Sequence, residues 1–272
     1  MSLGMKWYAP SGGESLPHND AIARLAAADI VLLGEQHDRA DIHRWQLHVA
    51  AGLLAHRPLV MGFEMFPARL DPVLAEWIAG DMDEATFLER TDWAKVWGFP
   101  PELYLPLFRF CRETGTPMVG LNVRRDLVRQ VGKGGWDSVP EADREGLSPP
   151  APSPLPYRQF IFDLVGAGPA GRGAKGPADP AFDRFVRAQE VWDCAFATRL
   201  FGATETATDT AVRPIVVGII GQGHLQWGGG VSWQLAHLGI DNVHTAIPQQ
   251  TGAQRLQPGV AELACVLPKA FS

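Results

Sequence analysis

The chain has 272 residues without a break in composition, which favours a single domain over residues 1–272. Hydrophobic residues make up 46% and charged residues 20%, a balance that excludes fibrous and largely disordered proteins. The formal net charge is -6 and no run of Lys or Arg forms a basic stripe, so we expect no nucleic-acid partner.

Four short β-rich runs are continuously apolar, as in parallel strands covered on both faces. They lie at residues 29–33, 58–62, 117–121 and 215–220. The segment 41–56 has apolar residues at helical spacing and predicts a β-α-β unit with a right-handed crossover.

Helical patterns between the second and third strands predict a cap over about residues 67–113, with helices at 71–79, 83–90 and 101–112. Residues 132–180 are crowded with Gly and Pro and predict a long, partly mobile insertion, since such a stretch buries too little apolar area. The remaining patterns predict helices at 181–201 and 231–238 and strands at 243–247 and 263–267. The fold class is therefore α/β, with a mostly parallel central sheet flanked by helices.

Polar residues follow these strands, and in open α/β sheets ligands bind outside the carboxyl ends of the strands. The first strand leads to Glu35 and His37, the second to Glu64, and the fourth to Gln222 and His224. The third leads to Asn122, with Arg124 just beyond. We expect these side chains to share one pocket.

Two carboxylates and two imidazoles suit zinc or another divalent metal with an activated water. Glu35, His37, Glu64 and His224 are thus candidate metal ligands or catalytic residues of a hydrolase acting on an ester, amide or peptide bond. Any one of them alone is more often a cap, a surface group or a satisfied buried polar residue. Only their convergence favours the functional interpretation.

Two further features accompany this constellation. The segment TDWAKVWGFPPELYLPLFRF gathers aromatic area around one phenol, which is usually an ordinary core layer. The alternative is a site for a flat apolar ligand, with Tyr104 as an oxygen donor to ferric haem. Gln189 and Asp193, one helical turn apart, form either a supporting layer for the pocket or an ordinary polar seam.

The sequence resembles the ChaN family of haem-binding proteins, within the Tiki and erythromycin-esterase-like superfamily. The matching segments, in the expected order from about residue 29 to 247, are VLLGEQHDRADIHRWQ, GFEMF, WGF, YLPLFRF, VGLNVRR, AQEVWDCAFA and GIIGQGHLQWGGGV.

The resemblance implies a mostly parallel α/β fold, haem binding at or near a homodimer interface, and a role in iron acquisition. The family's tyrosine ligand falls on Tyr104, and the candidate haem-contacting residues are Tyr104, His37, His43, Trp97, Arg124 and His224. In the wider superfamily, the positions matching Glu35, His37, Glu64 and His224 are associated with metal-dependent or carboxylate-histidine hydrolysis.

The cysteines and the chain start bear on the compartment. Cys111, Cys194 and Cys265 lack C-x-x-C spacing and are expected to be reduced core thiols. No apolar run reaches the roughly 18 residues of a membrane span. The start MSLGMKWYAP has neither a signal-peptide core nor the lipidated cysteine of many haem-uptake lipoproteins. We expect a cytoplasmic protein, unless a native leader preceded this start.

Overall fold

The computed structural model describes residues 4–205 and 212–268. Residues 1–3, which begin the start segment MSLGMKWYAP, lie outside the described residues. Within the described part, the helices are all too short or too polar to cross a bilayer. The three cysteines are free and buried, as expected.

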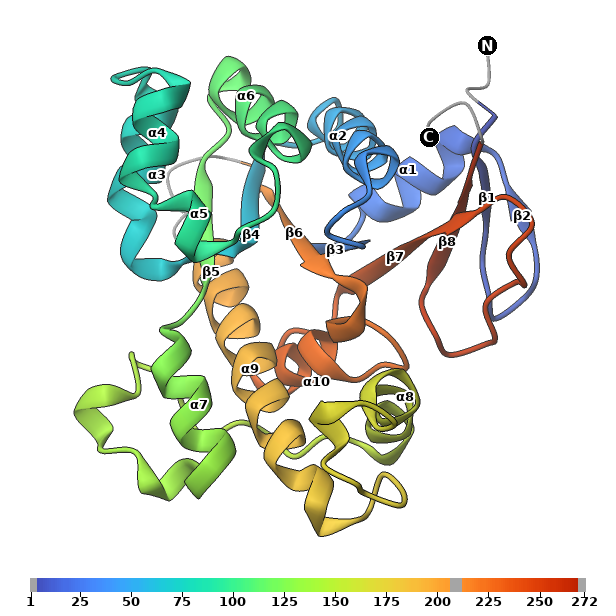
Figure 1. Ribbon diagram of the computed structural model, residues 1–272. Helices are drawn as coiled ribbons and strands as arrows, with labels where there is room; N and C mark the ends of the chain where they lie inside the picture. Colours follow the sequence, from blue (N-terminus) through green and yellow to red (C-terminus); the bar gives the residue numbers. More distant parts are fainter. Residues whose placement is uncertain (1–3, 206–211, 269–272) are drawn as a thin grey trace.

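One eight-stranded sheet organises the molecule, in the order β2-β1-β8-β7-β3-β6-β4-β5 (Figure 1). The pairings from β8 to β5 are all parallel, whereas β1 pairs antiparallel with β2 and β8. The predicted mostly parallel α/β fold is confirmed. The strands are β1 Lys6–Tyr8, β2 Ser15–Leu16, β3 Ile30–Glu35, β4 Leu59–Pro67, β5 Met118–Asn122, β6 Ile215–Gly221, β7 Val243–Gln250 and β8 Leu263–Leu267.

Helices cover both faces of the sheet, which explains why the central strands are continuously apolar. On β3, Val31 and Leu33 belong to one buried cluster while Ile30 and Leu32 belong to the other. The first cluster includes residues of α1 (His18–Ala26), α2 (Ala40–Leu54) and α6 (Leu105–Thr114). The second includes residues of α7 (Arg125–Gly134), α9 (Asp183–Glu205) and α10 (Gly230–His237).

The segment between β4 and β5 is helical, as predicted. It contains α3 (Asp71–Ala79), α4 (Glu84–Arg90), α5 (Trp93–Val96) and α6, and these pack above the β4–β5 edge of the sheet (Figure 1). Helix α6 starts later than the pattern suggested, because a separate 3-10 turn occupies Pro101–Leu103.

The Gly- and Pro-rich segment contains a helix that the prediction lacked. Helix α8 (Leu155–Val165) buries Tyr157 and Ile161 in a small cluster with Phe182 and Val186. The expectation that this stretch buries too little apolar area is therefore wrong at α8. A few large side chains that pack against α9 stabilise a helix in a segment whose average composition predicts no helix.

The strand order has one feature that a reading along the chain does not predict. Strands β3 and β4 are consecutive members of the expected β-α-β unit, yet β6 lies between them and pairs with both. The chain after β6 therefore emerges between the ends of β3 and β4.

Strand β4 also leaves its regular register where it carries its carboxylate. Phe63 pairs with Gly120 and Pro67 with Asn122, so the three residues 64–66 oppose one residue of β5. A Cβ on Gly120 would lie 2.8 Å from the carbonyl oxygen of Phe66, so the irregularity requires glycine there. Such bulges redirect side chains, and this one begins at Glu64.

Candidate functional site

The carboxyl ends of β3, β4 and β6 bring the predicted residues together. Glu35 ends β3, Glu64 lies in the β4 bulge, and His224 ends the 3-10 turn Gln222–His224 that follows β6. One ligand atom each from Glu35, His37 and Glu64 lie within 4.8 Å of one another, and His224 Nε2 is 3.9 Å from Glu64 Oε1. We call these four residues the strand-end site.

Glu35 is the buried centre of one half of the site. Its Oε1 is 2.6 Å from His37 Nδ1 and its Oε2 is 3.0 Å from His43 Nε2. Burial raises the pKa of Glu35, but the hydrogen bonds from both imidazoles outweigh it, and the pKa lies below its ordinary value. Glu35 is therefore ionised, and its oxygens orient two imidazoles.

His37 is the more accessible imidazole of the site, with a side chain 32% exposed. Burial lowers its pKa, yet the bond to Glu35 and the charge of Glu64 more than compensate, so the pKa is raised. Its ring packs edge-on against Trp97, with centroids 4.7 Å apart. Since Glu35 occupies Nδ1, Nε2 is the nitrogen available to a ligand.

The other half of the site is built around His224. Its Nδ1 lies 2.6 Å from Asp193 Oδ1 and 3.0 Å from the Gln189 amide, both on α9. Asp193 also accepts a 3.0 Å hydrogen bond from the buried phenol of Tyr157. Burial lowers the pKa of His224, but the neighbouring Asp193 and Glu64 carboxylates raise it above its ordinary value.

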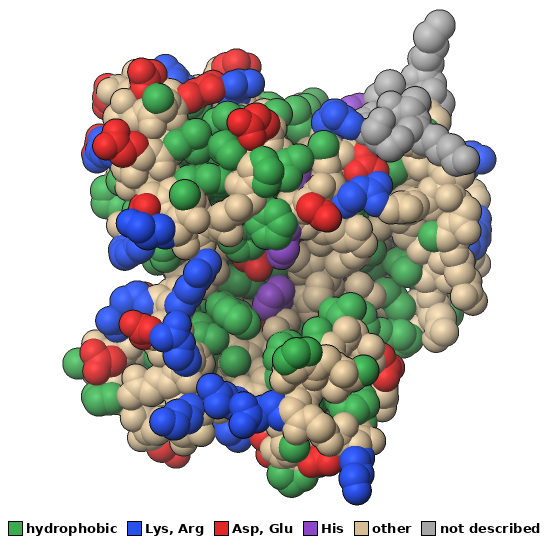
Figure 2. Space-filling view, viewed as in Figure 1, with side chains coloured by type: hydrophobic (Ala, Val, Ile, Leu, Met, Phe, Trp, Pro, Cys, Tyr) green, Lys and Arg blue, Asp and Glu red, His purple; other side chains and the backbone are tan. Residues whose placement is uncertain are grey.

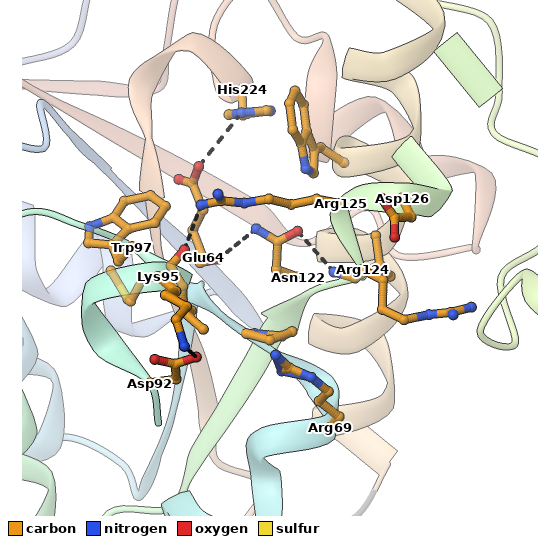
Figure 3. Close-up of a pocket in the computed structure, with 15 residues that line it drawn as sticks. Glu64, Arg69, Asp92, Lys95, Trp97, Asn122, Arg124, Arg125, Asp126 and His224 are labelled. Atoms are coloured by element: carbon orange, nitrogen blue, oxygen red, sulfur yellow. Dashed lines mark hydrogen bonds and ion pairs between the residues drawn. The ribbon is translucent and has the colours of Figure 1, made fainter. Parts of the chain in front are cut away.

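Glu64 faces both imidazoles. Its Oε2 accepts a hydrogen bond from the backbone N–H of Gly221, while its Oε1 points toward His224 (Figure 3). Burial is the main reason that its pKa is raised. A Cβ on Gly221 would lie 3.0 Å from His37 and 3.2 Å from Glu64 Oε2, so glycine at this position lets the two side chains approach.

The donor set fits a divalent metal. The cluster that could hold one ion is Glu35, His37 and Glu64, whose ligand atoms lie within 4.8 Å of one another, and His224 Nε2 approaches this cluster at Glu64 Oε1. Glu35 and Asp193 hold the Nδ1 atoms of the two imidazoles. Carboxylates that orient metal-bound histidines in this way are common behind metal ligands. Both oxygens of Glu35 also contact imidazoles, so this carboxylate, expected as a ligand, orients His37 and His43 as well.

Comparison with known proteins identifies the family. The model of the family described as "Haem-binding uptake, Tiki superfamily, ChaN" matches residues 21–235. This chain belongs to that family. A search of curated proteins finds no match.

Two solved structures share the ChaN-family fold. ChaN of Campylobacter jejuni, described with cofacial haem binding, aligns with a TM-score of 0.70 and 15% identity over 97% of each chain. An erythromycin esterase mutant in its open conformation aligns with a TM-score of 0.51 and 14% identity, over 96% of this chain and 82% of that one. At such identities the likeness concerns the fold alone.

A cleft of approximately 480 Å³ opens at the strand-end site of this ChaN-family protein, on the side of Glu64 and His224. Figure 2 shows the hollow, with histidine side chains on its floor and Lys and Arg side chains along one margin. Glu64, His224, Trp97 and Trp192 line it, and so do four cationic residues: Arg69, Lys95, Arg124 and Arg125. The volume lies within the range of small-molecule sites.

The expected haem residues are placed unevenly around this cleft. Trp97, Arg124 and His224 line it, whereas Tyr104, His37 and His43 do not. His37 lies at the border of the cleft, where its ring packs against Trp97. The phenol of Tyr104 is fully buried and donates hydrogen bonds to Glu35 Oε1 and the His37 carbonyl, at 3.3 and 3.2 Å. Burial, followed by the Glu35 charge, raises the pKa of Tyr104 well above its ordinary value.

Haem therefore fits this cleft through an imidazole better than through a phenolate. All three tyrosines of the chain are buried, and Tyr104 and Tyr157 each donate to a carboxylate. The His37 side chain is accessible, and Trp97 and Trp192 offer aromatic surface. Lys95 and Arg124 pair with Asp92 and Glu145, which leaves Arg69 and Arg125, without an ion pair in the described part of the chain, for propionates.

Sequence reasoning missed two parts of the site. Tyr157, which ties α8 to Asp193, lies in the segment predicted as an insertion, and one phenol among prolines gives no local signal. The arginines beside the cleft on α7 and α9 are spread over two distant stretches, so no charge run marks them. Gln189 and Asp193, left open between a seam and a supporting layer, do contact His224.

Proposed function

We propose that this protein binds haem at the strand-end site, with His37 Nε2, at the border of the cleft, as the iron ligand and cationic residues for the propionates, among them Arg125. The observation that carries the proposal is the accessible imidazole of His37. It is held at Nδ1 by Glu35 and flanked by Trp97, which lines the cleft. Membership of a haem-binding uptake family supports the same function.

The carboxylate behind His37 has a chemical consequence for iron binding. A carboxylate that accepts the Nδ1 proton makes the opposite nitrogen more basic and fixes the direction in which it points. Bound haem would supply a redox-active iron, or serve as cargo in iron acquisition. The homodimer that the family resemblance implies remains a prediction, to be measured by light scattering with and without haemin.

A haemin titration tests the proposal. Wild type should give a saturable Soret shift, and His37→Ala should weaken haemin binding at least tenfold. Tyr104→Phe should leave the spectrum unchanged, because the phenol is fully buried. The matched control is the exposed His237→Ala. A non-saturating titration of wild type, or a spectrum lost in Tyr104→Phe but kept in His37→Ala, contradicts the assignment.

Hydrolysis is a second candidate, favoured by the other half of the site. His224, held by Asp193, and Glu64, whose pKa burial raises, lie 3.9 Å apart at the nearest atoms. That arrangement suits one group that removes a proton from water and another that protonates a leaving group. A divalent metal held by Glu35, His37 and Glu64 would supply Lewis-acid activation of the same water.

A substrate panel tests this second function. Wild-type protein, metal-free and supplemented with Zn²⁺, should hydrolyse at least one ester, amide or peptide, and Glu64→Gln should lower the rate at least a hundredfold. His237→Ala again serves as the control. Equal rates in wild type and Glu64→Gln across the panel would exclude hydrolysis at the strand-end site.

A further inference from the structure

A second cavity of approximately 580 Å³ lies beside the cleft, between α7, α9 and the 3-10 turn Pro169–Gly171. Its charged lining residues are all arginines: Arg125, Arg129, Arg172 and Arg184. We call this cavity the arginine groove. In a chain with 30 acidic and 24 basic residues, a lining with four arginines and no carboxylate departs strongly from the overall charge.

These arginines are poorly neutralised by the protein. Within the described part of the chain, Arg172 and Arg184 form no ion pair, and Arg125 donates to the carbonyl of Val96. Arg129 alone pairs with a carboxylate, that of Asp126, at 3.2 Å in an exposed position. Like charges gathered around one cavity repel each other, and an anionic ligand relieves that repulsion.

The backbone at Arg172 adds a second observation. Its φ of 52° lies in the left-handed region, which non-glycine residues rarely adopt. Such a conformation persists only where the surroundings require it. Here it belongs to a residue that lines the groove, next to the turn Pro169–Gly171.

The arginine groove continues into the cleft. Arg125 and Trp192 line both cavities, and the Trp192 ring lies with its centroid 6.2 Å from that of His224. The groove also has an apolar wall of Val128, Phe185, Ala188 and Trp192. A ligand that fills both cavities therefore needs acidic groups at one end and an apolar body.

We propose that the arginine groove is an anion site that holds the acidic groups, phosphate or carboxylate, of the ligand whose other part occupies the cleft. Guanidinium groups bind both kinds of anion through paired hydrogen bonds. The link to the cleft ligand rests on the proposed function, whereas the anion site itself does not.

Calorimetric titration with pyrophosphate and with a tricarboxylate tests the anion site. At least one should bind wild type saturably, and Arg172→Gln with Arg184→Gln should weaken it at least tenfold. Arg90→Gln, an exposed arginine on α4, should have no effect. The stronger of the two probes identifies the anionic group. Absence of saturable binding of both, or equal weakening in Arg90→Gln, overturns the proposal.

The same double variant tests the link to the cleft. If the two cavities hold one ligand, haemin affinity should fall at least fivefold in the Arg172→Gln, Arg184→Gln protein. Unchanged haemin affinity there, combined with its loss in His37→Ala, overturns the link while leaving haem binding intact. If haemin does not bind wild type but pyrophosphate does, the proposed function fails and the anion site stands.

Discussion

Two groups of histidines in this protein have opposite surroundings. In the strand-end site, His37 and His224 each contact a carboxylate through Nδ1 at 2.6 Å. Near β1, His18 and His48 contact each other instead, with their Nε2 atoms 3.1 Å apart. The pKa is raised in the first pair by the carboxylates. It is lowered in the second by burial and, for His18, by the neighbouring His48.

The difference shows what distinguishes a site from a packing contact made with the same residue type. A carboxylate behind an imidazole fixes its tautomer and leaves one nitrogen free for a ligand. The His18–His48 pair uses its nitrogens on itself, and His18 Nδ1 accepts the indole N–H of Trp7 at 3.0 Å. That pair ties α1 to α2 and offers no free nitrogen on His18.

The largest expected change in stability follows from removing Glu35, the carboxylate that holds His37. Glu35→Ala leaves His37, His43 and Tyr104 without their shared acceptor in a buried position, so we expect the free energy of unfolding to fall by about 3–5 kcal/mol. Urea unfolding measures it, with the exposed Glu113→Ala as control. A loss no greater than that of the control would mean that Glu35 does not organise the site.

Removing only the charge of Asp193 tests how the carboxylate raises the pKa of His224 in the strand-end site. In Asp193→Asn the burial of His224 is no longer offset by Asp193, so the pKa of His224 should fall, as NMR titration of the imidazole will show. We expect a stability loss of about 1–2 kcal/mol at pH 6. An unchanged His224 titration would contradict the role of Asp193.

The sign of the accompanying pH dependence follows from linkage. Because the folded pKa of His224 is raised, its contribution to stability is fully present below pH 6.5, its ordinary pKa, and is lost as the pH rises through the folded pKa. The loss of unfolding free energy in Asp193→Asn should therefore become smaller as the pH rises from 6. Asp137→Asn, at an exposed position, should show no such trend.

The smallest expected change in stability concerns the His18–His48 pair. His48→Gln should cost about 1 kcal/mol or less above pH 6.5, where the contact between the two neutral imidazoles is intact. Because both folded pKa values are lowered, that contribution is lost as the pH falls below 6.5. The difference from wild type in urea unfolding should shrink toward pH 5. A difference that grows in acid would contradict the lowered pKa values.

Local patterns predicted most of the fold. The apolar runs located β3, β4, β5 and β6, and the spacing of apolar residues located α2, α3, α9 and α10. They missed α1, α5, α7 and α8, together with the short strands β1 and β2. In α8 only Tyr157 and Ile161 are buried, and they pack against Phe182 and Val186, which follow in a later segment of the chain.

The sequence by itself determined which chemical groups stand at the strand ends, because continuous apolar runs and the polar residues after them are local properties. Tertiary structure alone decided that β6 lies between β3 and β4, which places His224 beside Glu64, and that the β4 bulge turns Glu64 into the shared space. It also decided that Asp193 and Tyr157 lie behind His224. Strand order and bulges depend on packing between residues distant in the chain. The periodicity of apolar residues is a local property, so it does not predict those contacts.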